Sequence, residues 1–138
     1  MSISPVYSQE EVVFYDTDCG GVVSNIAYLR YVEKARCHLF ASLGMGLASM
    51  NETQLFPTVI RTEIDYRKPA RLGDKLVVEA RIASFDKVRI QCDFIIYAEE
   101  DPSAKGNRVI FSEARQTVVL VQMPEGKPAR VPDGWKVD

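Results

Sequence analysis

The sequence is poor in the residues on which several common kinds of active site depend. Among 138 residues there are three widely spaced cysteines and a single histidine, His38. Such cysteines form neither a disulfide framework nor a CxxC metal pair, so we expect buried or half-buried thiols in a reducing compartment. One histidine excludes zinc sites of the HExxH kind. A Ser-His-Asp triad would need His38, which lies inside a predicted helix, and the sequence has no GxSxG motif.

Long apolar runs and an excess of basic charge are missing as well. No stretch approaches the roughly 20 apolar residues that a membrane span requires, and the first residues lack the basic and apolar regions of a signal peptide. Seventeen lysines and arginines against nineteen aspartates and glutamates give a net charge of −2, which argues against a nucleic-acid-binding surface. Walker and dinucleotide-binding glycine patterns are absent. We therefore predict a cytoplasmic protein without membrane or nucleic-acid partners, and no metal or redox cofactor is implied.

What remains is a composition typical of one folded domain. Apolar residues make up 46 % of the chain and charged residues 26 %, which is enough for a packed core at this length. We therefore predict that residues 1–138 form a single domain. The pattern of apolar residues indicates a first strand at residues 6–15, and the DTDCGG that follows is typical of a turn.

A helix is predicted from about Asn25 onward. Ser24 or Asn25 can cap its first turn, and Gly44 is a natural end. Arg36 lies within the apolar arc of this helix, so it should either pair with a carboxylate or extend past the edge of the sheet. The apolar side chains that share the arc are Tyr28, Leu29, Val32, Ala35, Leu39 and Leu43.

From Pro57 onward the apolar period is two, which is the spacing of strands. In the first run Ile60, Thr62, Ile64 and Tyr66 share one face. Three more runs follow at residues 75–85, 88–97 and 108–121, and their short connections predict antiparallel neighbours. The predicted fold is therefore α+β, with a five-stranded antiparallel sheet and one long helix. One helix cannot cover both faces of such a sheet, so we expect free strand edges to pair with a second copy.

The turn that joins the first strand to the helix is the place where chemistry is most plausible. Asp16 and Asp18 stand in it, just before a helix N-terminus, which carries about half a positive charge and unpaired N–H groups. Such an end can polarise a carbonyl or hold an oxyanion, and a nearby carboxylate can act as nucleophile or general base. On spacing alone, however, turn forming and helix capping are the more common roles of such aspartates.

The residues around this turn resemble a known family. The segment FYDTDCGGVVSNIAYLRYVEKAR is similar to the signature Y-x-DTD-x-x-GVV-x-x-x-x-YLR-[FY]-x-E-x-AR of the 4-hydroxybenzoyl-CoA thioesterase family of hotdog-fold proteins. A second segment, IDYRKPARLGDKLVVEARI, resembles the family's Y-x-x-PA-x-x-GD stretch. The resemblance implies a hotdog fold, in which a curved antiparallel sheet wraps around one long helix. It also implies edge-to-edge dimers, often as dimers of dimers (homotetramers), with active sites between subunits at the helix N-terminus.

The resemblance assigns the central roles to two residues. It implies that Asp18 is the catalytic carboxylate and that the backbone N–H of Asn25 holds the thioester oxygen, with Gly21 close by. Many family members have an aromatic residue and a histidine where this chain has Ser24 and Asn25. Asp18 would therefore act with backbone dipoles alone, and Asp16 would act mainly through the geometry of the turn.

Further substrate contacts follow from the same resemblance. Tyr28 could line an acyl pocket, and core packing is the alternative. Lys87 and Arg89 follow a turn at which family members place cations that contact CoA phosphates, although basic residues at turns are most often simply solvated. A second basic group consists of Arg67, Lys68 and Arg71.

Taken together, the residues and the resemblance predict an acyl-CoA thioesterase, which hydrolyses an acyl thioester to a carboxylic acid and free CoA. Three alternatives stay open. One is a thioesterase for acyl carrier protein, and another is a non-catalytic module that binds acyl thioesters. The third is a hotdog dehydratase or hydratase, whose site needs a histidine, whereas His38 lies deep in the predicted helix.

Overall fold

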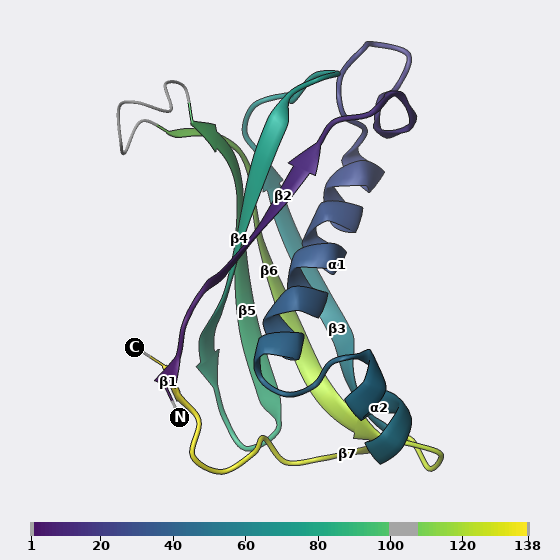
Figure 1. Cartoon of the computed structure of the whole chain (residues 1–138), viewed down its shortest axis with the longest axis vertical. Coiled ribbons are helices and arrows are strands. Elements are labelled where there is room, and N and C mark those ends of the chain that lie inside the picture. Colours follow the sequence, from purple (N-terminus) through teal and green to yellow (C-terminus); the bar gives the residue numbers. More distant parts are fainter. Residues whose placement is uncertain (1, 100–107, 138) are drawn as a thin grey trace.

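The structure, a computed structural model, describes residues 2–99 and 108–137. A curved antiparallel sheet wraps around one long helix (Figure 1), and its strands follow the order β2-β4-β5-β6-β3, with the short β7 added to β6. This arrangement confirms the predicted α+β fold of five long strands and one helix. The elements, in chain order, are β1 Ser2–Ile3, β2 Val6–Glu11, the 3-10 helix η1 Phe14–Asp16, α1 Asn25–Ser42, α2 Leu47–Thr53, β3 Leu55–Tyr66, β4 Lys75–Phe85, β5 Arg89–Glu99, β6 Arg108–Gln122, β7 Lys127–Pro128 and β8 Lys136–Val137.

The core lies between the concave face of the sheet and α1. Alternate side chains of β4 and β5 point into it, as the period of two predicts. On the helix, Val32, Ala35 and Leu39 are completely buried, and α1 packs chiefly on β2 and β4. The buried strand residues that face the helix are Leu76, Val78, Ala80 and Ile82 of β4, and Ile90, Cys92, Phe94 and Ile96 of β5.

Helix α1 begins and ends where the sequence predicts. The side-chain oxygen of Ser24 caps the helix by accepting the N–H of Ala27 at 3.3 Å. Just after the helix, Gly44 adopts φ +82°, a conformation that favours glycine. One predicted core position is wrong, because Leu29 is 39 % exposed whereas Tyr31 is buried. The buried stripe is turned toward Tyr31 because the helix lies over β2 and β4.

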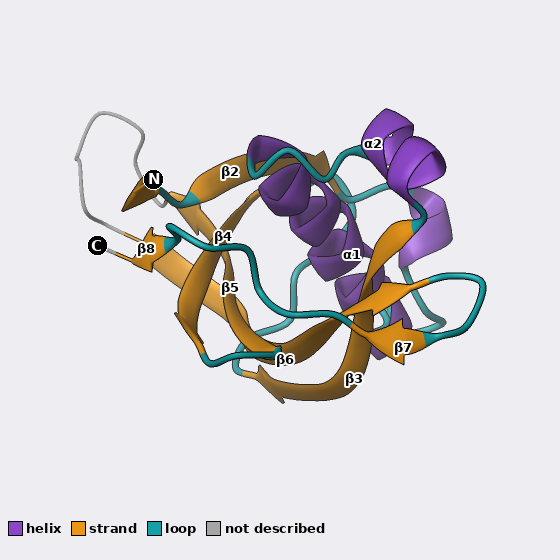
Figure 2. Ribbon diagram, turned by 90° about the horizontal axis from the view of Figure 1, so that it is seen from below, coloured by secondary structure: helices purple, strands orange, loops and turns teal. Residues whose placement is uncertain are grey.

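Some elements carry no signal that the sequence patterns detect. Helix α2 follows α1 and contacts β3, and the two-residue strands β1 and β8 form a separate parallel pair. This pair brings the two ends of the chain side by side (Figure 2). Among the described residues no helix is long and apolar enough to cross a membrane.

The guanidinium group of Arg36 has an amide partner. Its Nη1 donates to Oε1 of Gln116 at 2.8 Å, and Gln116, which is buried on β6, in turn donates to the hydroxyl of Thr62 at 3.2 Å. The predicted carboxylate partner is therefore wrong. A neutral amide oxygen satisfies the cation without bringing a second charge into the core.

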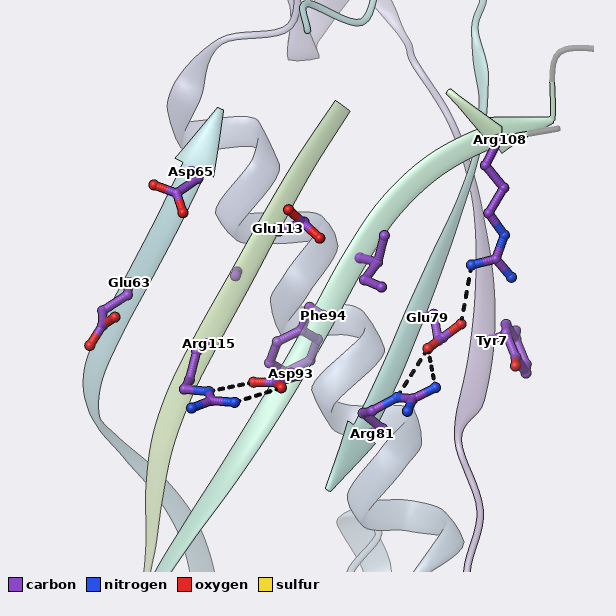
Figure 3. A pocket seen from close by; sticks show the side chains of 12 residues that line it. Tyr7, Glu63, Asp65, Glu79, Arg81, Asp93, Phe94, Arg108, Glu113 and Arg115 are labelled. Atoms are coloured by element: carbon purple, nitrogen blue, oxygen red, sulfur yellow. Dashed lines mark hydrogen bonds and ion pairs between the residues drawn. The ribbon is translucent and has the colours of Figure 1, made fainter. Parts of the chain in front are cut away.

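The outer face of the sheet carries charged side chains that pair with one another (Figure 3). A row across four strands alternates in sign, from Arg81 through Asp93 and Arg115 to Glu63. Arg115 donates to Asp93 at 2.6 and 2.8 Å, and the buried Glu79 pairs with Arg81 at 2.6 Å. These pairs line a hollow of about 630 Å³. A face of this kind is typical of the solvated side of an antiparallel sheet.

Strands β2 and β3 are the two edges of the sheet. In β3 the register shifts between Val59 and Arg61, and this bulge turns Ile60 out of the inner face on which the sequence pattern places it. Ile60 is consequently 55 % exposed. An uncovered edge strand of 12 residues offers a row of unpaired N–H and C=O groups to another strand.

Candidate active site

The DTDCGG segment forms a tight hairpin between η1 and α1. Thr17 pairs with Val23, and the N–H of Asp18 donates to the C=O of Val22 at 2.9 Å. At the tip, the N–H of Gly21 donates to the C=O of Asp18 at 3.1 Å, and Gly21 has φ +77°. This left-handed conformation is easily reached only by glycine. The hairpin presents Asp18 near its tip, and its second arm leads directly into α1.

The carboxylate of Asp18 is exposed and only half engaged. Its Oδ1 accepts the N–H of Gly20 at 2.8 Å. A Cβ atom at Gly20 would lie 3.2 Å from that oxygen, so the absence of a side chain permits the close approach. Within the described residues Oδ2 has no hydrogen-bond or ion-pair partner. One oxygen is thus tied to the turn, and the other is available as a nucleophile or a base.

Asp16, two residues earlier, is 3 % exposed and fully engaged. Its Oδ2 accepts the hydroxyl of Tyr31 at 2.8 Å and the N–H of Val13 at 3.1 Å, and its Oδ1 pairs with Arg30. Its C=O accepts the N–H of Ser24 at 2.8 Å. Burial raises the pKa of Tyr31 to about 12, so its hydroxyl remains a donor. These contacts clamp the base of the hairpin to α1, the structural role that was predicted for Asp16.

Asn25 is the first residue of α1 and is exposed. No partner for its N–H occurs in the described part of the chain, and its C=O accepts the hydroxyl of Tyr66 at 3.3 Å. Tyr66 is 48 % exposed. Sequence reasoning did not assign a site role to Tyr66, although it is the tyrosine of the Y-x-x-PA motif. The structure therefore adds a phenol to the junction of Asp18 and Asn25.

Tyr28 has the packing role that the sequence left open as the alternative. It is 3 % exposed, its ring lies 5.5 Å from that of Tyr66, and its hydroxyl accepts the N–H of Ala70 at 3.0 Å. Burial raises its pKa. Tyr28 thus ties α1 to the loop before β4 from beneath the site. Its contact with an acyl group stays a prediction.

Two aromatic side chains next to the hairpin are unusually exposed. Phe14 and Tyr15, which precede the DTD motif directly, are 81 % and 83 % exposed. The guanidinium of Arg30 lies 5.3 Å from the centre of the Tyr15 ring. Sequence reasoning took these residues as part of a strand. The consecutive aromatic pair beside the aspartates was the signal that could have identified them as a rim of the site.

The turn between β4 and β5 lies at the opposite end of the sheet from the hairpin between β2 and α1 (Figure 1). Lys87 lies in this turn and Arg89 is the first residue of β5, and Asp86 accepts the N–H groups of Val88 and Arg89 at 2.9 and 2.8 Å. Strand β4 has 11 residues and so spans roughly 35 Å. The structure therefore does not bring these cations to Asp18 within one chain. Their contact with a substrate at Asp18 stays a prediction that requires a second copy.

Side chains suited to a metal ion are not gathered anywhere in residues 2–99 and 108–137, where no group of three or more His, Cys, Asp or Glu residues is placed to hold one. The three cysteines, Cys19, Cys37 and Cys92, are unpaired. Cys92 is buried, as expected, but the expectation of burial is wrong for Cys19 and Cys37, which are exposed on the hairpin and on the outer side of α1. The chemistry that the junction offers by itself is that of a carboxylate beside backbone N–H groups at a helix end.

Comparison with protein families decides the relationship of the chain. The family model described as the thioesterase-like superfamily matches residues 12–136. The chain belongs to this superfamily. The predicted thioesterase relationship is thereby confirmed at the level of the thioesterase-like superfamily, and the narrower 4-hydroxybenzoyl-CoA thioesterase-like grouping stays a prediction.

Curated relatives match this superfamily member over most of their length. The acyl-CoA thioesterase YbgC of Haemophilus influenzae is 30 % identical over 122 residues, which cover 88 % of this chain and 84 % of the relative. The 1,4-dihydroxy-2-naphthoyl-CoA hydrolase of Synechococcus elongatus is 27 % identical over 119 residues, covering 85 % of this chain and 88 % of the relative.

Solved structures of thioesterases agree with the fold. A probable thioesterase from Bartonella henselae has a TM-score of 0.74 at 26 % identity and covers 93 % of this chain and 98 % of its own. A 1,4-dihydroxy-2-naphthoyl-CoA thioesterase from Synechocystis has a TM-score of 0.78 at 25 % identity. The match covers 94 % of this chain and 90 % of the Synechocystis chain. Together with the superfamily match, they confirm the predicted hotdog fold.

Proposed function

We propose that this superfamily member is an acyl-CoA thioesterase, which uses water to cleave an acyl thioester to a carboxylic acid and free CoA. One observation carries the proposal: the hairpin that bears the exposed carboxylate of Asp18, one oxygen of which has no partner among the described residues, leads directly into the unpartnered N–H of Asn25 at the start of α1. The names of the relatives, an acyl-CoA thioesterase and a naphthoyl-CoA hydrolase, support it. At the finer level, the two sequence motifs support a relationship to the 4-hydroxybenzoyl-CoA thioesterase-like enzymes.

The thioester carbonyl oxygen accepts the N–H of Asn25 at the positive end of α1. This contact polarises the carbonyl and stabilises the negative charge that develops on its oxygen. Gly21 contributes open space, because nothing lies within 4 Å of the position that its Cβ would take. Its own N–H is already bound to Asp18. The clamp at Asp16 holds the hairpin so that Asp18 faces the same carbonyl.

Asp18 acts by one of two routes. In the first, its carboxylate attacks the carbonyl carbon, the C–S bond breaks, the thiolate leaves and takes up a proton, and water hydrolyses the mixed anhydride. In the second, Asp18 takes a proton from water, whose oxygen attacks the carbonyl carbon directly; the C–S bond then breaks, and the leaving thiolate takes up the proton from Asp18. Both routes use only groups of the chain and water, so neither requires a metal or redox cofactor.

The active form is a homodimer or a dimer of dimers. The long, uncovered edge of β3 supports this assembly, because it exposes both backbone groups and the apolar side chain of Ile60. In such an assembly Lys87 and Arg89 reach a CoA molecule from the second copy. The three unpaired cysteines support a cytoplasmic location.

A hydrolysis screen tests the proposed function. Aromatic, short, medium and long acyl-CoA thioesters are compared with the same acyl groups on acyl carrier protein, and release of the free thiol is measured. We expect turnover of at least one acyl-CoA class, which the Asp18→Asn variant abolishes. Tight binding of acyl-CoA without turnover would indicate a non-catalytic binding module instead. Turnover of carrier-protein thioesters alone would reassign the substrate.

A further inference from the structure

The loop between β3 and β4 lies against the catalytic hairpin. Val22 of the hairpin pairs with Arg71 of the loop, and on its other side the C=O of Val22 accepts the N–H of Asp18 at 2.9 Å. Asp18, Val22 and Arg71 therefore form one row across three adjacent segments. Residues directly opposite one another in neighbouring strands place their side chains on the same face. At the usual strand spacing, the Cα atoms of Asp18 and Arg71 are about 10 Å apart.

The side chains of this row face solvent, and hydrogen bonds hold the backbone of the loop at Arg71. Val23, next to Val22, points into the core, and Ala70, next to Arg71, is completely buried. The C=O of Ala70 accepts the N–H of Val23 at 2.8 Å. The N–H of Arg71 donates to Oδ2 of Asp74 at 2.8 Å. The backbone of Arg71 is thus held on both sides, while its side chain is exposed.

The cations of this loop differ in whether they already have a partner. Arg67 donates to the carboxylate of Glu113 at 2.5 Å. For the exposed side chains of Lys68 and Arg71, by contrast, the described part of the structure contains no carboxylate partner. Lys68 and Arg71 therefore leave two positive charges without a partner near the exposed carboxylate of Asp18. Such charges can bind an anionic group of the ligand on which Asp18 acts.

We propose that Arg71, assisted by Lys68, binds the phosphate at the end of the pantetheine arm of the thioester carrier. The inference rests on the proposed thioesterase function and identifies the chemical class of the carrier. CoA and the prosthetic group of acyl carrier proteins share this phosphate, which is the first anionic group that the arm reaches from the thioester. Lys87 and Arg89 lie roughly 35 Å away along β4 on this chain, so they serve the nucleotide from a second copy.

The test compares one acyl group on three carriers: CoA, 4′-phosphopantetheine and pantetheine, which has no phosphate. Arg71→Ala is measured beside Arg67→Ala, the matched control, whose cation is already paired with Glu113. We expect Arg71→Ala to raise KM roughly fivefold to tenfold for the two phosphorylated carriers and to leave kcat unchanged. KM for the pantetheine thioester should not change, and Arg67→Ala should resemble the wild type with all three. The effect should shrink as the salt concentration rises.

Each other pattern overturns the inference. An equal rise of KM for all three carriers would show that Arg71 acts on the fold of the hairpin. A rise for CoA alone would assign Arg71 to the nucleotide phosphates. The same rise in Arg67→Ala would show a general effect of charge. Calorimetric binding of free CoA, 4′-phosphopantetheine and pantetheine to the same variants needs no turnover. If binding of both CoA and 4′-phosphopantetheine weakens in Arg71→Ala, binding of pantetheine does not, and no thioester is hydrolysed, the phosphate site stands and the proposed function fails.

Discussion

At each end of the sheet an aspartate closes a turn, and the two turns differ in use. At one end Asp18 accepts the N–H of Gly20 at 2.8 Å. At the other, Asp86 accepts the N–H groups of Val88 and Arg89 at 2.9 and 2.8 Å. Both carboxylates are exposed and close a turn through their own backbone. Only Asp18 lies at the start of a long helix, beside an N–H without a partner.

The difference between the two aspartates lies in what their oxygens are used for. The N–H groups of Arg89 and Val88 hold the pKa of the Asp86 carboxyl below its usual value, so that carboxylate is stabilised as a turn acceptor. Asp18 binds a single N–H and keeps an oxygen free. An exposed aspartate that closes a turn is therefore not a site by itself. Asp18 becomes part of a candidate site because the fold places a helix N-terminus and the loop between β3 and β4 next to its hairpin.

The largest effect on activity is expected from replacing the aspartate of the hairpin, with the same replacement at the opposite end of the sheet as the control. Asp18→Asn keeps an oxygen that can accept the N–H of Gly20, so the turn is preserved, but it removes the nucleophile or base. We expect kcat to fall about 100-fold or more, while Asp86→Asn leaves kcat near the wild-type value. Steady-state hydrolysis of the best acyl-CoA measures both. Turnover by Asp18→Asn close to the wild type would contradict the catalytic assignment.

The second prediction concerns the oligomer, in which the Asp18 end of one copy would lie near the Lys87 end of another. Light scattering should show an even number of subunits in the wild type. Ile60→Lys places a charge on the edge of β3, so we expect dissociation to monomers and loss of most activity. Val137→Lys, at another exposed apolar position, serves as the control and should keep the wild-type mass. A stable, active wild-type monomer would refute the predicted oligomer.

A smaller effect is expected at the base of the hairpin. Asp16→Asn weakens the contacts to Arg30 and Tyr31 in a buried position. We expect a loss of about 2 kcal/mol in the free energy of unfolding, measured by urea titration, and a smaller fall in kcat than in Asp18→Asn. If Asp16→Asn proved the more damaging to kcat at a temperature where both variants are folded, the roles of the two aspartates would be reversed.

Much of the fold is encoded in local periodicity. The inner faces of β4 and β5, the cap at Ser24 and the end of α1 near Gly44 follow from spacing and turn chemistry. The errors occur where tertiary structure overrides the pattern. A bulge turns Ile60 outward, the placement of α1 exposes Leu29, and strands of two residues are too short to show any period.

The site shows the same limit more sharply. The family resemblance singles out Asp18, but the burial of Asp16 depends on Arg30 and Tyr31, 14 and 15 residues further along the chain. No local sequence pattern predicts these contacts of Asp16. Similarly, the place of Lys87 depends on which way β4 runs from the loop at Arg71, and hence on the topology of the sheet.

The smallest effect belongs to the far end of the sheet. If Lys87 and Arg89 meet the nucleotide of CoA from a second copy, Lys87→Ala should raise KM for acyl-CoA about fivefold, as expected for an exposed charge contact of roughly 1 kcal/mol. It should leave kcat unchanged, because the phosphates are bound alike in the ground and transition states.

Unlike the change in KM expected in Arg71→Ala, the change in Lys87→Ala should vanish with the 4′-phosphopantetheine thioester, which has no nucleotide. It should also vanish in an Ile60→Lys background, since a monomer cannot bring the two ends of different copies together. An unchanged KM for acyl-CoA would return Lys87 to the role of a solvated turn residue, whereas an equal rise of KM with both carriers would place it in the fold of the β4–β5 turn.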